Sequence, residues 1–317
     1  MKTIAKLFTM LILVSVFTSC NDNEDIDIKT NTIVDVAVNN ELTSLVDAVT
    51  RAELVTTLSS SGSFTVLAPT NNAFTKFLAT TPYATINDVP KELLRQILLN
   101  HVITGSLKST DLSTGYFNTN ATSDASNTEM SIYINTDNGV EFNGISKVTI
   151  ADVSADNGTV HVIDEVIGLP TVVTFATADP NFSTLVSALT RETSFNYVST
   201  LSTATGTSPA PFTVFAPTND AFTSLIAELS ISGLSDITTP TLTAALNTHV
   251  VAGANVQESG LSDNMNVETL GGDLTVNITS SGATLTDPEE RVSTIVATNV
   301  QANNGVIHAI NKVLLDL

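Results

Sequence analysis

One stretch of twelve residues occurs twice in this chain, as SFTVLAPTNNAF at Ser63–Phe74 and as PFTVFAPTNDAF at Pro211–Phe222. The copies lie 148 residues apart, counted from Pro69 to Pro217. Two further blocks recur at offsets of 148 and 147 residues, each around a histidine: LLNHV and LNTHV around His101 and His249, NGTVHVIDEV and NGVIHAINKV around His161 and His308. Solenoid units repeat about every 20–50 residues, so a period this long indicates two whole domains.

The repeated blocks resemble those of the fasciclin family, a module of extracellular and cell-surface proteins. That family has a strand running into Ala-Pro-Thr-Asn/Asp-x-Ala-Phe, then a Tyr-His motif, then Asn-Gly-hydrophobic-hydrophobic-His. Corresponding segments occur here twice and in that order, and the resemblance covers residues 30–317. It implies a compact β-sandwich or wedge with helices packed against it. We therefore expect two tandem fasciclin-like domains, at residues 31–169 and 170–317.

Residue patterns in each half predict helices first and strands afterwards. Apolar residues spaced i, i+3, i+4, i+7 are typical of an amphipathic helix. These stripes are Leu42, Leu45, Val46 and Val49 in one half and Phe182, Leu185, Val186 and Leu189 in the other. β-branched runs separated by turns follow at 130–135, 140–143, 147–153 and 159–166, and at 273–279, 283–285, 294–300 and 306–313. Helices followed by strands indicate an α+β fold rather than alternating α/β.

The Ala-Pro-Thr block predicts a strand, a turn and the start of a helix. Its proline would end the strand, because proline has no N–H to donate. Its threonine would cap the helix, and its last phenylalanine would lie on the buried helix face. The residues expected in these structural roles are Pro69, Thr70 and Phe74 in one half and Pro217, Thr218 and Phe222 in the other.

The N-terminus resembles a bacterial lipoprotein signal. Lys2 and Lys6 precede an apolar run over Leu7–Phe17, and Thr18-Ser19-Cys20 follows. A basic start, a short apolar core and small residues before a cleavage site are typical of a secretory signal. The run is shorter than the roughly 20 apolar residues that span a bilayer. We expect residues 1–19 to be removed and Cys20 to carry the lipid. The alternative is an ordinary secreted protein in which Cys20 is incidental.

Residues 20–30 form an acidic segment without apolar periodicity, which is typical of a solvated tether. The segment resembles the acidic signals of surface-exported lipoproteins, which favours the external face of the outer membrane over a periplasm-facing position. Cys20 is the only cysteine, so no disulfide can form within the chain. The formal net charge of −20 argues against nucleic acid as a partner, because phosphate binding depends on Lys and Arg.

The four histidines could suggest a metal or catalytic site, but their spacing does not favour one. His101 and His249 end helical stripes, where an imidazole can meet the last free carbonyl groups. His161 and His308 alternate with apolar residues in strands. The sequence contains no His-x-x-x-His, paired Cys, Gly-x-Ser-x-Gly or phosphate-binding loop. We expect four structural histidines, no catalytic residues, no metal and no cofactor.

The segment 152–163 partly matches the residue pattern of a calcium-binding loop. Asp152-x-Ser154-x-Asp156 has the first spacings of such a loop. Gly158 comes one position late, however, and Ile163 stands where a bidentate Glu belongs. We therefore interpret this segment as the turn into the Asn-Gly strand.

The resemblance also implies candidate binding residues. The family's adhesive function has been associated with the Tyr-His motif and with an Asp-Ile element just before Asn-Gly. The matching positions are Asn100-His101 and Asp152-Val153. Tyr is absent from both copies, and the second copy has Asn299 in place of the Asp. These departures argue against integrin-like recognition.

Three functions remain open: a lipid-anchored adhesion or matrix-interaction protein, a surface lipoprotein that binds glycans or small ligands for uptake, and an enzyme. The first is favoured, because no catalytic constellation is present. Its partner would be a protein or glycan on neighbouring cells or matrix, with the lipid on Cys20 in the membrane. The copies differ most in the polar segments 105–128, 202–211 and 286–291, so we expect recognition through these loops.

Overall fold

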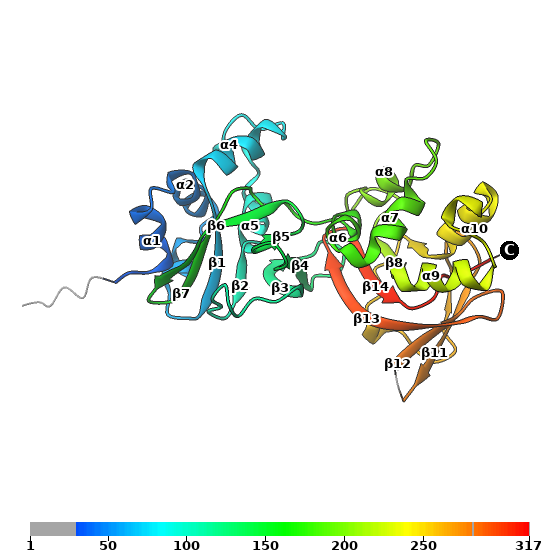
Figure 1. The fold of residues 1–317 in the computed structure, drawn as a ribbon. Coiled ribbons are helices and arrows are strands. Elements are labelled where there is room, and N and C mark those ends of the chain that lie inside the picture. Colours follow the sequence, from blue (N-terminus) through cyan, green and yellow to red (C-terminus); the bar gives the residue numbers. More distant parts are fainter. Residues whose placement is uncertain (1–29, 281, 317) are drawn as a thin grey trace, which may run out of the picture. The chain divides into compact units, whose positions relative to one another are not determined.

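The computed structural model describes residues 30–280 and 282–316 (Figure 1). The expected signal peptide, Cys20 and nearly all of the acidic tether lie outside the described residues. In the described part, each half begins with helices, has one strand between helices at Phe64–Pro69 or Phe212–Pro217, and ends with the remaining strands. None of the helices in this part has the length and apolar character needed to cross a membrane.

The two halves are called domain 1 and domain 2 below. The elements of domain 1 are α1 (Ile33–Asn39), α2 (Thr43–Arg51), α3 (Val55–Ser59), β1 (Phe64–Pro69), α4 (Asn71–Ala79), η1 (Ile86–Asp88), α5 (Lys91–Leu99), β2 (Val102–Thr104), β3 (Gly115–Thr122), β4 (Glu129–Asn135), β5 (Glu141–Phe142), β6 (Ser146–Ala155) and β7 (Gly158–Ile163). The elements of domain 2 are α6 (Val172–Ala178), η2 (Pro180–Phe182), α7 (Ser183–Leu189), α8 (Tyr197–Leu201), β8 (Phe212–Pro217), α9 (Asn219–Glu228), η3 (Leu234–Asp236), α10 (Thr239–Thr248), β9 (Val250–Ala252), η4 (Glu258–Gly260), β10 (Asn266–Val267), β11 (Leu274–Thr279), β12 (Gly282–Thr286), β13 (Val292–Ala302) and β14 (Gly305–Ile310). The α+β prediction is confirmed.

Each domain contains one mixed seven-stranded sheet, in the order β2-β1-β7-β6-β5-β4-β3 and β10-β11-β12-β13-β14-β8-β9. The long strand β6 pairs with β7 over most of its length and with β5 at its N-terminal end. Because β6 belongs to both pairings, the sheet of domain 1 forms two layers, and its end strands β2 and β3 pack against one another.

The central strands are buried on both faces. Val66 and Ala68 of β1 pack under the helices, whereas Leu67 between them packs between the two layers. Val214 and Phe215 of β8 divide in the same way in domain 2. Side chains alternate across a strand, so a strand covered on both faces needs a nearly continuous apolar run. The repeated block supplies that run.

The Ala-Pro-Thr residues lie where this central strand gives way to a helix. Each proline ends its strand, and each threonine hydroxyl accepts a hydrogen bond from the backbone N–H three residues later, at 3.2 Å in α4 and 3.4 Å in α9. Each phenylalanine is buried. These residues are Pro69, Thr70 and Phe74, and Pro217, Thr218 and Phe222.

The Asn-Gly pair before β7 closes the domain. The Asn157 amide accepts from the first N–H of α1 and donates to two carbonyl oxygens at the end of α3, at 2.8–2.9 Å. Gly158 must be glycine, because a Cβ there would lie 2.0 Å from the carbonyl oxygen of Phe64. Asn304 and Gly305 occupy the same places in domain 2, where a Cβ would come within 2.4 Å of backbone.

The expectation that 105–128 is a loop throughout is wrong, whereas recognition through this segment stays a prediction. The segment contains β3, which pairs antiparallel with β4. Thr119 of β3 is fully buried, and its hydroxyl lies 3.1 Å from the Asn100 side-chain oxygen and 3.2 Å from the Met130 carbonyl oxygen. Polar side chains that find partners inside a protein can be buried, so composition misled the prediction. Segment 202–211 does form a loop after α8.

The outer strands β3 and β4 contact domain 2 through aromatic rings. The Tyr116 ring lies 5.0 Å from that of Tyr133 and 5.6 Å from that of Phe175 in α6. The Tyr116 hydroxyl donates to the Asp179 carboxylate at 3.1 Å. Tyr133 is 2% exposed and belongs to the apolar cluster under the helices of domain 2.

A buried glutamine adds polar contacts beside these rings. Gln301 of β13 is 2% exposed. Its backbone N–H donates to the Ser131 hydroxyl and its side-chain amide donates to the Ser123 hydroxyl, both at 3.0 Å. Its side-chain oxygen accepts from Asn255 at 3.3 Å. The two domains therefore share a buried apolar and polar contact.

Candidate functional site

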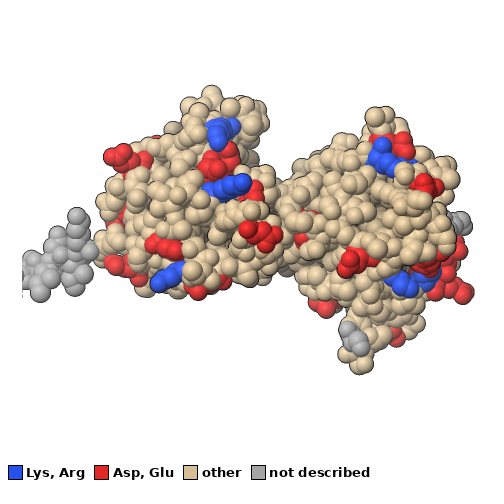
Figure 2. All heavy atoms as spheres, in the orientation of Figure 1, with Lys and Arg blue, Asp and Glu red and all other residues tan. Residues whose placement is uncertain are grey.

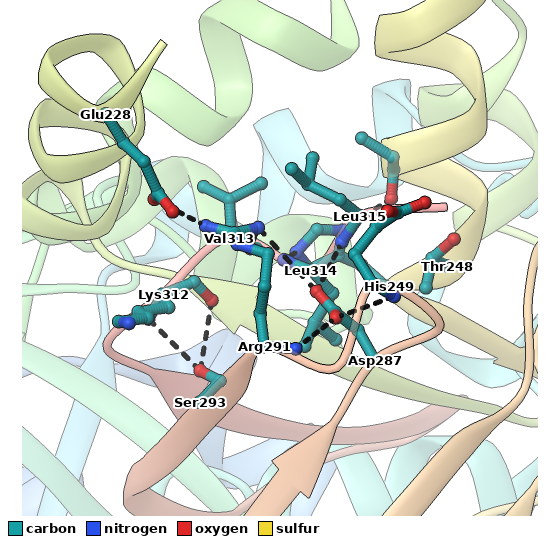
Figure 3. Close-up of polar contacts among 12 residues, drawn as sticks. Glu228, Thr248, His249, Asp287, Arg291, Ser293, Lys312, Val313, Leu314 and Leu315 are labelled. Atoms are coloured by element: carbon teal, nitrogen blue, oxygen red, sulfur yellow. Dashed lines mark hydrogen bonds and ion pairs between the residues drawn. The ribbon is translucent and has the colours of Figure 1, made fainter. Parts of the chain in front are cut away.

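His101 and His249 each join the end of a helix to the last segment of their domain. Nδ1 of His101 lies 2.7 Å from the Ile97 carbonyl oxygen, and Nε2 accepts from the Ile167 N–H at 2.9 Å. A carbonyl only accepts, so the proton of this neutral ring lies on Nδ1. His249 repeats the arrangement with the carbonyl four residues earlier, at 2.6 Å, and with the Leu314 N–H, at 2.9 Å (Figure 3).

His161 and His308 are the opposite tautomer. Nε2 of His161 donates to the Leu107 carbonyl oxygen at 3.1 Å, and Nδ1 accepts from the Asp152 N–H at 3.2 Å. In domain 2, His308 donates to a backbone carbonyl at 2.9 Å and accepts from the Asn299 N–H at 3.4 Å. These imidazoles hold a strand bulge from inside the sandwich.

All four imidazoles are neutral because of their surroundings. Burial lowers the pKa of His101 and of His249 to about 4. Burial also lowers the pKa values of His161 and His308. Both nitrogens of each ring are bound to backbone groups, so the rings have no nitrogen left for a metal or substrate. Among residues 30–280 and 282–316, no group of three His, Cys, Asp or Glu side chains could hold a metal ion.

Asn100 lies at the Tyr position of the family motif and is fully buried. Its amide donates to the Gly168 carbonyl oxygen at 3.0 Å. Thr248, in the same place in domain 2, is also fully buried. Asn100 and His101 thus present no surface to a partner, and the structure does not bring them together with Asp152.

Asp152 lies in an exposed bulge of β6, which we call the β6 bulge and define as Thr149–Asp152. The register of β6 against β7 shifts twice here, and Asp152 has φ +61°. Its carboxylate accepts from the backbone N–H and the hydroxyl of Ser109, both at 2.7 Å. The Ser109 hydroxyl and N–H lower the pKa of the Asp152 carboxyl, so Asp152 is ionised at neutral pH.

The β6 bulge is both exposed and held in place. Its backbone is hydrogen-bonded to His161 beneath it. The Asp152 side chain is 38% exposed and is hydrogen-bonded to Ser109 beside it. Ile150 is 52% exposed, whereas Val153 is partly buried. The left-handed conformation of Asp152 is uncommon for a non-glycine residue and persists here because three hydrogen bonds define it. An aliphatic group and a carboxylate are thereby presented on a firm backbone.

Domain 2 has the same bulge with different chemistry. The β13 bulge, Val296–Asn299, also lies between two register shifts, and Asn299 has φ +59°. The Asn299 side-chain oxygen accepts from the Glu258 N–H at 2.8 Å. Val296 is 55% exposed. A neutral amide therefore stands where domain 1 has a carboxylate.

Inspection of the sequence did not single out Ile150, Ser109 or Val296. An isoleucine inside a β-branched run is normally interpreted as core. The one available signal was the acidic Asp152 in the middle of that run, where a bulge would break the alternation.

The turn at 286–291 anchors the C-terminal segment (Figure 3). The buried Asp287 carboxylate accepts from the Leu315 N–H at 2.9 Å. Arg291 donates to the Val313 carbonyl oxygen at 2.7 Å and to the Glu228 carboxylate at 2.8 Å. The charged groups of Asp287 and Arg291 therefore stabilise the fold, and recognition through the segment stays a prediction.

Apolar crevices occur beside the helices, but they are small. One between α1, α2, α3 and β1 has a volume of about 20 Å³, and its equivalent in domain 2 has about 30 Å³. A third, beside His249, has about 50 Å³. Small-molecule sites typically span about 300–1,000 Å³, so these crevices are gaps in packing. Figure 2 shows isolated Lys and Arg side chains on the face in view, without a continuous basic patch.

Comparison with known proteins gives relatives for both domains. Residues 40–170 and 180–316 match the family model for the fasciclin domain. Protein sll1735 of Synechocystis sp. is 40% identical over 137 residues, 43% of this chain and 96% of that protein. Transforming growth factor-beta-induced protein ig-h3 of Sus scrofa is 30% identical over 256 residues, 80% of this chain and 35% of the relative.

A solved structure matches the fold over both domains. It is a FAS1 domain pair from the insect cell adhesion molecule fasciclin I, with a TM-score of 0.55 and 20% identity, and the match covers 88% of this chain and 98% of that chain. The family models cover most of the chain, in two consecutive copies. The chain therefore belongs to the fasciclin family and carries two tandem fasciclin domains.

Proposed function

We propose that this protein is a non-enzymatic adhesion or matrix-interaction module, held at the cell surface by a lipid on Cys20. The observation that carries the proposal is the β6 bulge, an exposed Ile150 beside the ionised Asp152 on backbone tied to His161. Such a surface gains binding energy from the aliphatic group and orientation from the carboxylate, at little cost in conformational entropy.

Two further observations support binding over catalysis. The histidines, which would be the usual acid–base groups, are neutral and bound to backbone at both nitrogens. The structurally similar domain pair comes from a protein named as a cell adhesion molecule. The chain spans only 35% of the pig relative, so the partner of that protein is not transferred to this one.

The anchor belongs to the proposal through the sequence alone. Lipidation of Cys20 would leave residues 21–30 as an acidic spacer between the membrane and domain 1. Changing Cys20→Ala should release mature protein from membranes or leave the signal uncleaved. Membrane-bound protein of mature size in that variant would show that Cys20 does not anchor the chain.

The binding surface is tested by adhesion of cells that display the whole protein. Ile150→Ser and Asp152→Ala together should weaken adhesion about tenfold or more, because central contacts carry most of an interface's energy. Val296→Ser in the β13 bulge is the control for exposure, because Val296 is 55% exposed and Ile150 is 52% exposed. Circular dichroism should show the variants folded, since the altered side chains are exposed or half-exposed.

Each result of the adhesion assay has a definite meaning. Loss in the β6 variant with little change in the control supports the proposal, and unchanged adhesion in the β6 variant refutes the assigned site. Treating the partner surface with protease or with glycosidases then distinguishes a protein partner from a glycan. Binding to a glycan array that does not depend on the β6 bulge would favour the uptake lipoprotein instead.

A further inference from the structure

Four Asn-Gly pairs occur in the chain, and the structure treats one of them differently. They are Asn138-Gly139, Asn143-Gly144, Asn157-Gly158 and Asn304-Gly305. In such a pair, the backbone nitrogen of glycine can attack the asparagine side-chain carbonyl carbon and close a five-membered ring. Glycine favours this attack because it lacks a Cβ and has a wide range of backbone conformations. Each pair is therefore a potential site of spontaneous chemistry.

Three of the asparagines are buried and held by hydrogen bonds. Asn157 and Asn304 each use their side-chain oxygen and nitrogen to join the first helix of a domain to a later segment. Asn143 is 3% exposed, and its side-chain oxygen accepts from the Tyr133 N–H at 2.8 Å. Ring closure at these sites would require the side chain to break its hydrogen bonds, so the reaction would require local opening of the fold.

Asn138 has none of this protection. It lies in the exposed turn between β4 and β5, and Asp137 and Gly139 on either side are exposed as well. Within the described ranges, no residue hydrogen-bonds to the Asn138 side chain. Gly139 has φ +89°, and the space where its Cβ would lie is open to 4 Å. The side chain and the glycine nitrogen are thus free to approach one another.

We propose that Asn138 is a site of spontaneous deamidation in the folded protein. The Gly139 nitrogen loses its proton and forms a bond to the Asn138 side-chain carbon, and the side-chain nitrogen leaves as ammonia. Water then adds to one of the two carbonyl carbons of the cyclic imide and opens the ring. One opening gives an aspartate with the original backbone, and the other gives an isoaspartyl residue with an extra backbone carbon. Only water is consumed.

The product changes the local charge and chain path. A new carboxylate appears next to Asp137 and close in sequence to Glu141 of β5. The isoaspartyl form also lengthens the turn whose ends are set by the Asn135–Glu141 pair. The reaction is irreversible without a repair enzyme, so the modified fraction would increase with the age of each molecule.

The test is peptide mapping by mass spectrometry after incubation of the purified full chain in warm, mildly alkaline buffer. Isoaspartyl residues are labelled with isoaspartyl methyltransferase. Conversion at Asn138 should be at least about tenfold faster than at the three buried asparagines, because only the buried sites require local opening of the fold before they can react. Asn138→Gln should abolish most isoaspartyl labelling, since glutamine would have to form a larger ring. Circular dichroism before and after incubation verifies that the fold persists.

A second incubation in concentrated urea gives the control for the fold. All four pairs should react at similar rates there, because they share the same Asn-Gly sequence. The proposal is overturned if Asn138 remains intact in the folded protein, or if the buried pairs react as fast as Asn138 while the fold persists.

Discussion

The hairpin β3–β4 of domain 1 and the hairpin β10–β11 of domain 2 occupy the same place in the same fold and have different surfaces. Tyr116 and Tyr133 face each other across the first hairpin, where they contact domain 2. Asn266 and Thr275 form the corresponding cross-strand pair in the second hairpin, and both are exposed. The fold is the same around both pairs, so the difference in residue type reflects what covers each pair: domain 2 in the first hairpin and solvent in the second.

The inward faces of the two hairpins show the opposite behaviour. Ile132 and Ile134 of β4 are fully buried, as are Leu274 and Val276 at the matching positions of β11. A sandwich core demands apolar residues wherever it occurs. The outer faces of the hairpins are not part of this core. The outer face is therefore aromatic where the other domain packs against it and polar where it is exposed to solvent.

The largest effect should come from the covered face. Tyr133→Ala should lower the free energy of unfolding by about 3–5 kcal/mol, because it removes a fully buried aromatic ring. Thr275→Ala, its counterpart, should change that free energy by less than about 0.5 kcal/mol. Urea unfolding followed by circular dichroism measures both. Equal small effects would mean that the two domains do not share a core contact.

The buried histidines should make both domains sensitive to acid in the same way. Folding lowers the pKa of His101 and His249 from 6.5 to about 4, so the unfolded chain binds the proton first as pH falls. The stability linked to each neutral ring is complete above pH 6.5, decreases as pH falls toward about 4, and changes no further below. The loss should be about 3 kcal/mol per histidine.

The measurement is unfolding free energy as a function of pH for the parent chain, His101→Gln and His249→Gln. Glutamine does not titrate, so each variant should lose one histidine's share of the slope in that window. A slope that persists unchanged in both variants would assign the acid sensitivity to other groups. A change in only one would show that the two domains differ in their cores as well as at their surfaces.

The smallest of the three effects should come from the buried amide between the domains. Gln301→Ala removes one hydrogen-bond partner of the Ser123 hydroxyl together with the acceptor of the Asn255 amide, and should lower the unfolding free energy by about 1–3 kcal/mol. Ser154 has the same place in β6 and is exposed, so Ser154→Ala is the matched control with an effect near zero. A similar loss in both variants would contradict a specific role for Gln301.

Separate fragments of residues 30–169 and 170–317 test the comparison as a whole. Each keeps its own helix-side and inter-layer clusters, so each should melt cooperatively. The lost contacts at Tyr133 and Gln301 should make the fragments less stable than the full chain. An unfolded half would show that the copies depend on a shared core.

Much of the fold could be predicted from the sequence, because the relevant patterns are local. The helical stripes became α2 and α7, and most β-branched runs became strands. The strand β3 was missed since its threonines and asparagines look like a loop, and nothing local shows that Thr119 would find partners in Asn100 and Met130. Long-range hydrogen bonds decided that burial.

The candidate site was predictable only in part. Asp152 was identified by family resemblance together with Asn100 and His101, yet the structure buries the latter two and leaves Asp152 exposed. Ile150 became a candidate only through the register shifts that turn it outward. Which way a residue faces in a bulged strand depends on its pairing partners, and these lie far away in the chain.

The sequence by itself determined that this protein is one fasciclin domain repeated, with an apolar central strand and capped helices in each copy. These features follow from short patterns whose physical meaning does not depend on distant residues. Only the tertiary structure decided which polar groups are buried, which tautomer each histidine adopts, and which faces meet. Those properties depend on hydrogen-bond partners and packing neighbours that come together only when the chain has folded.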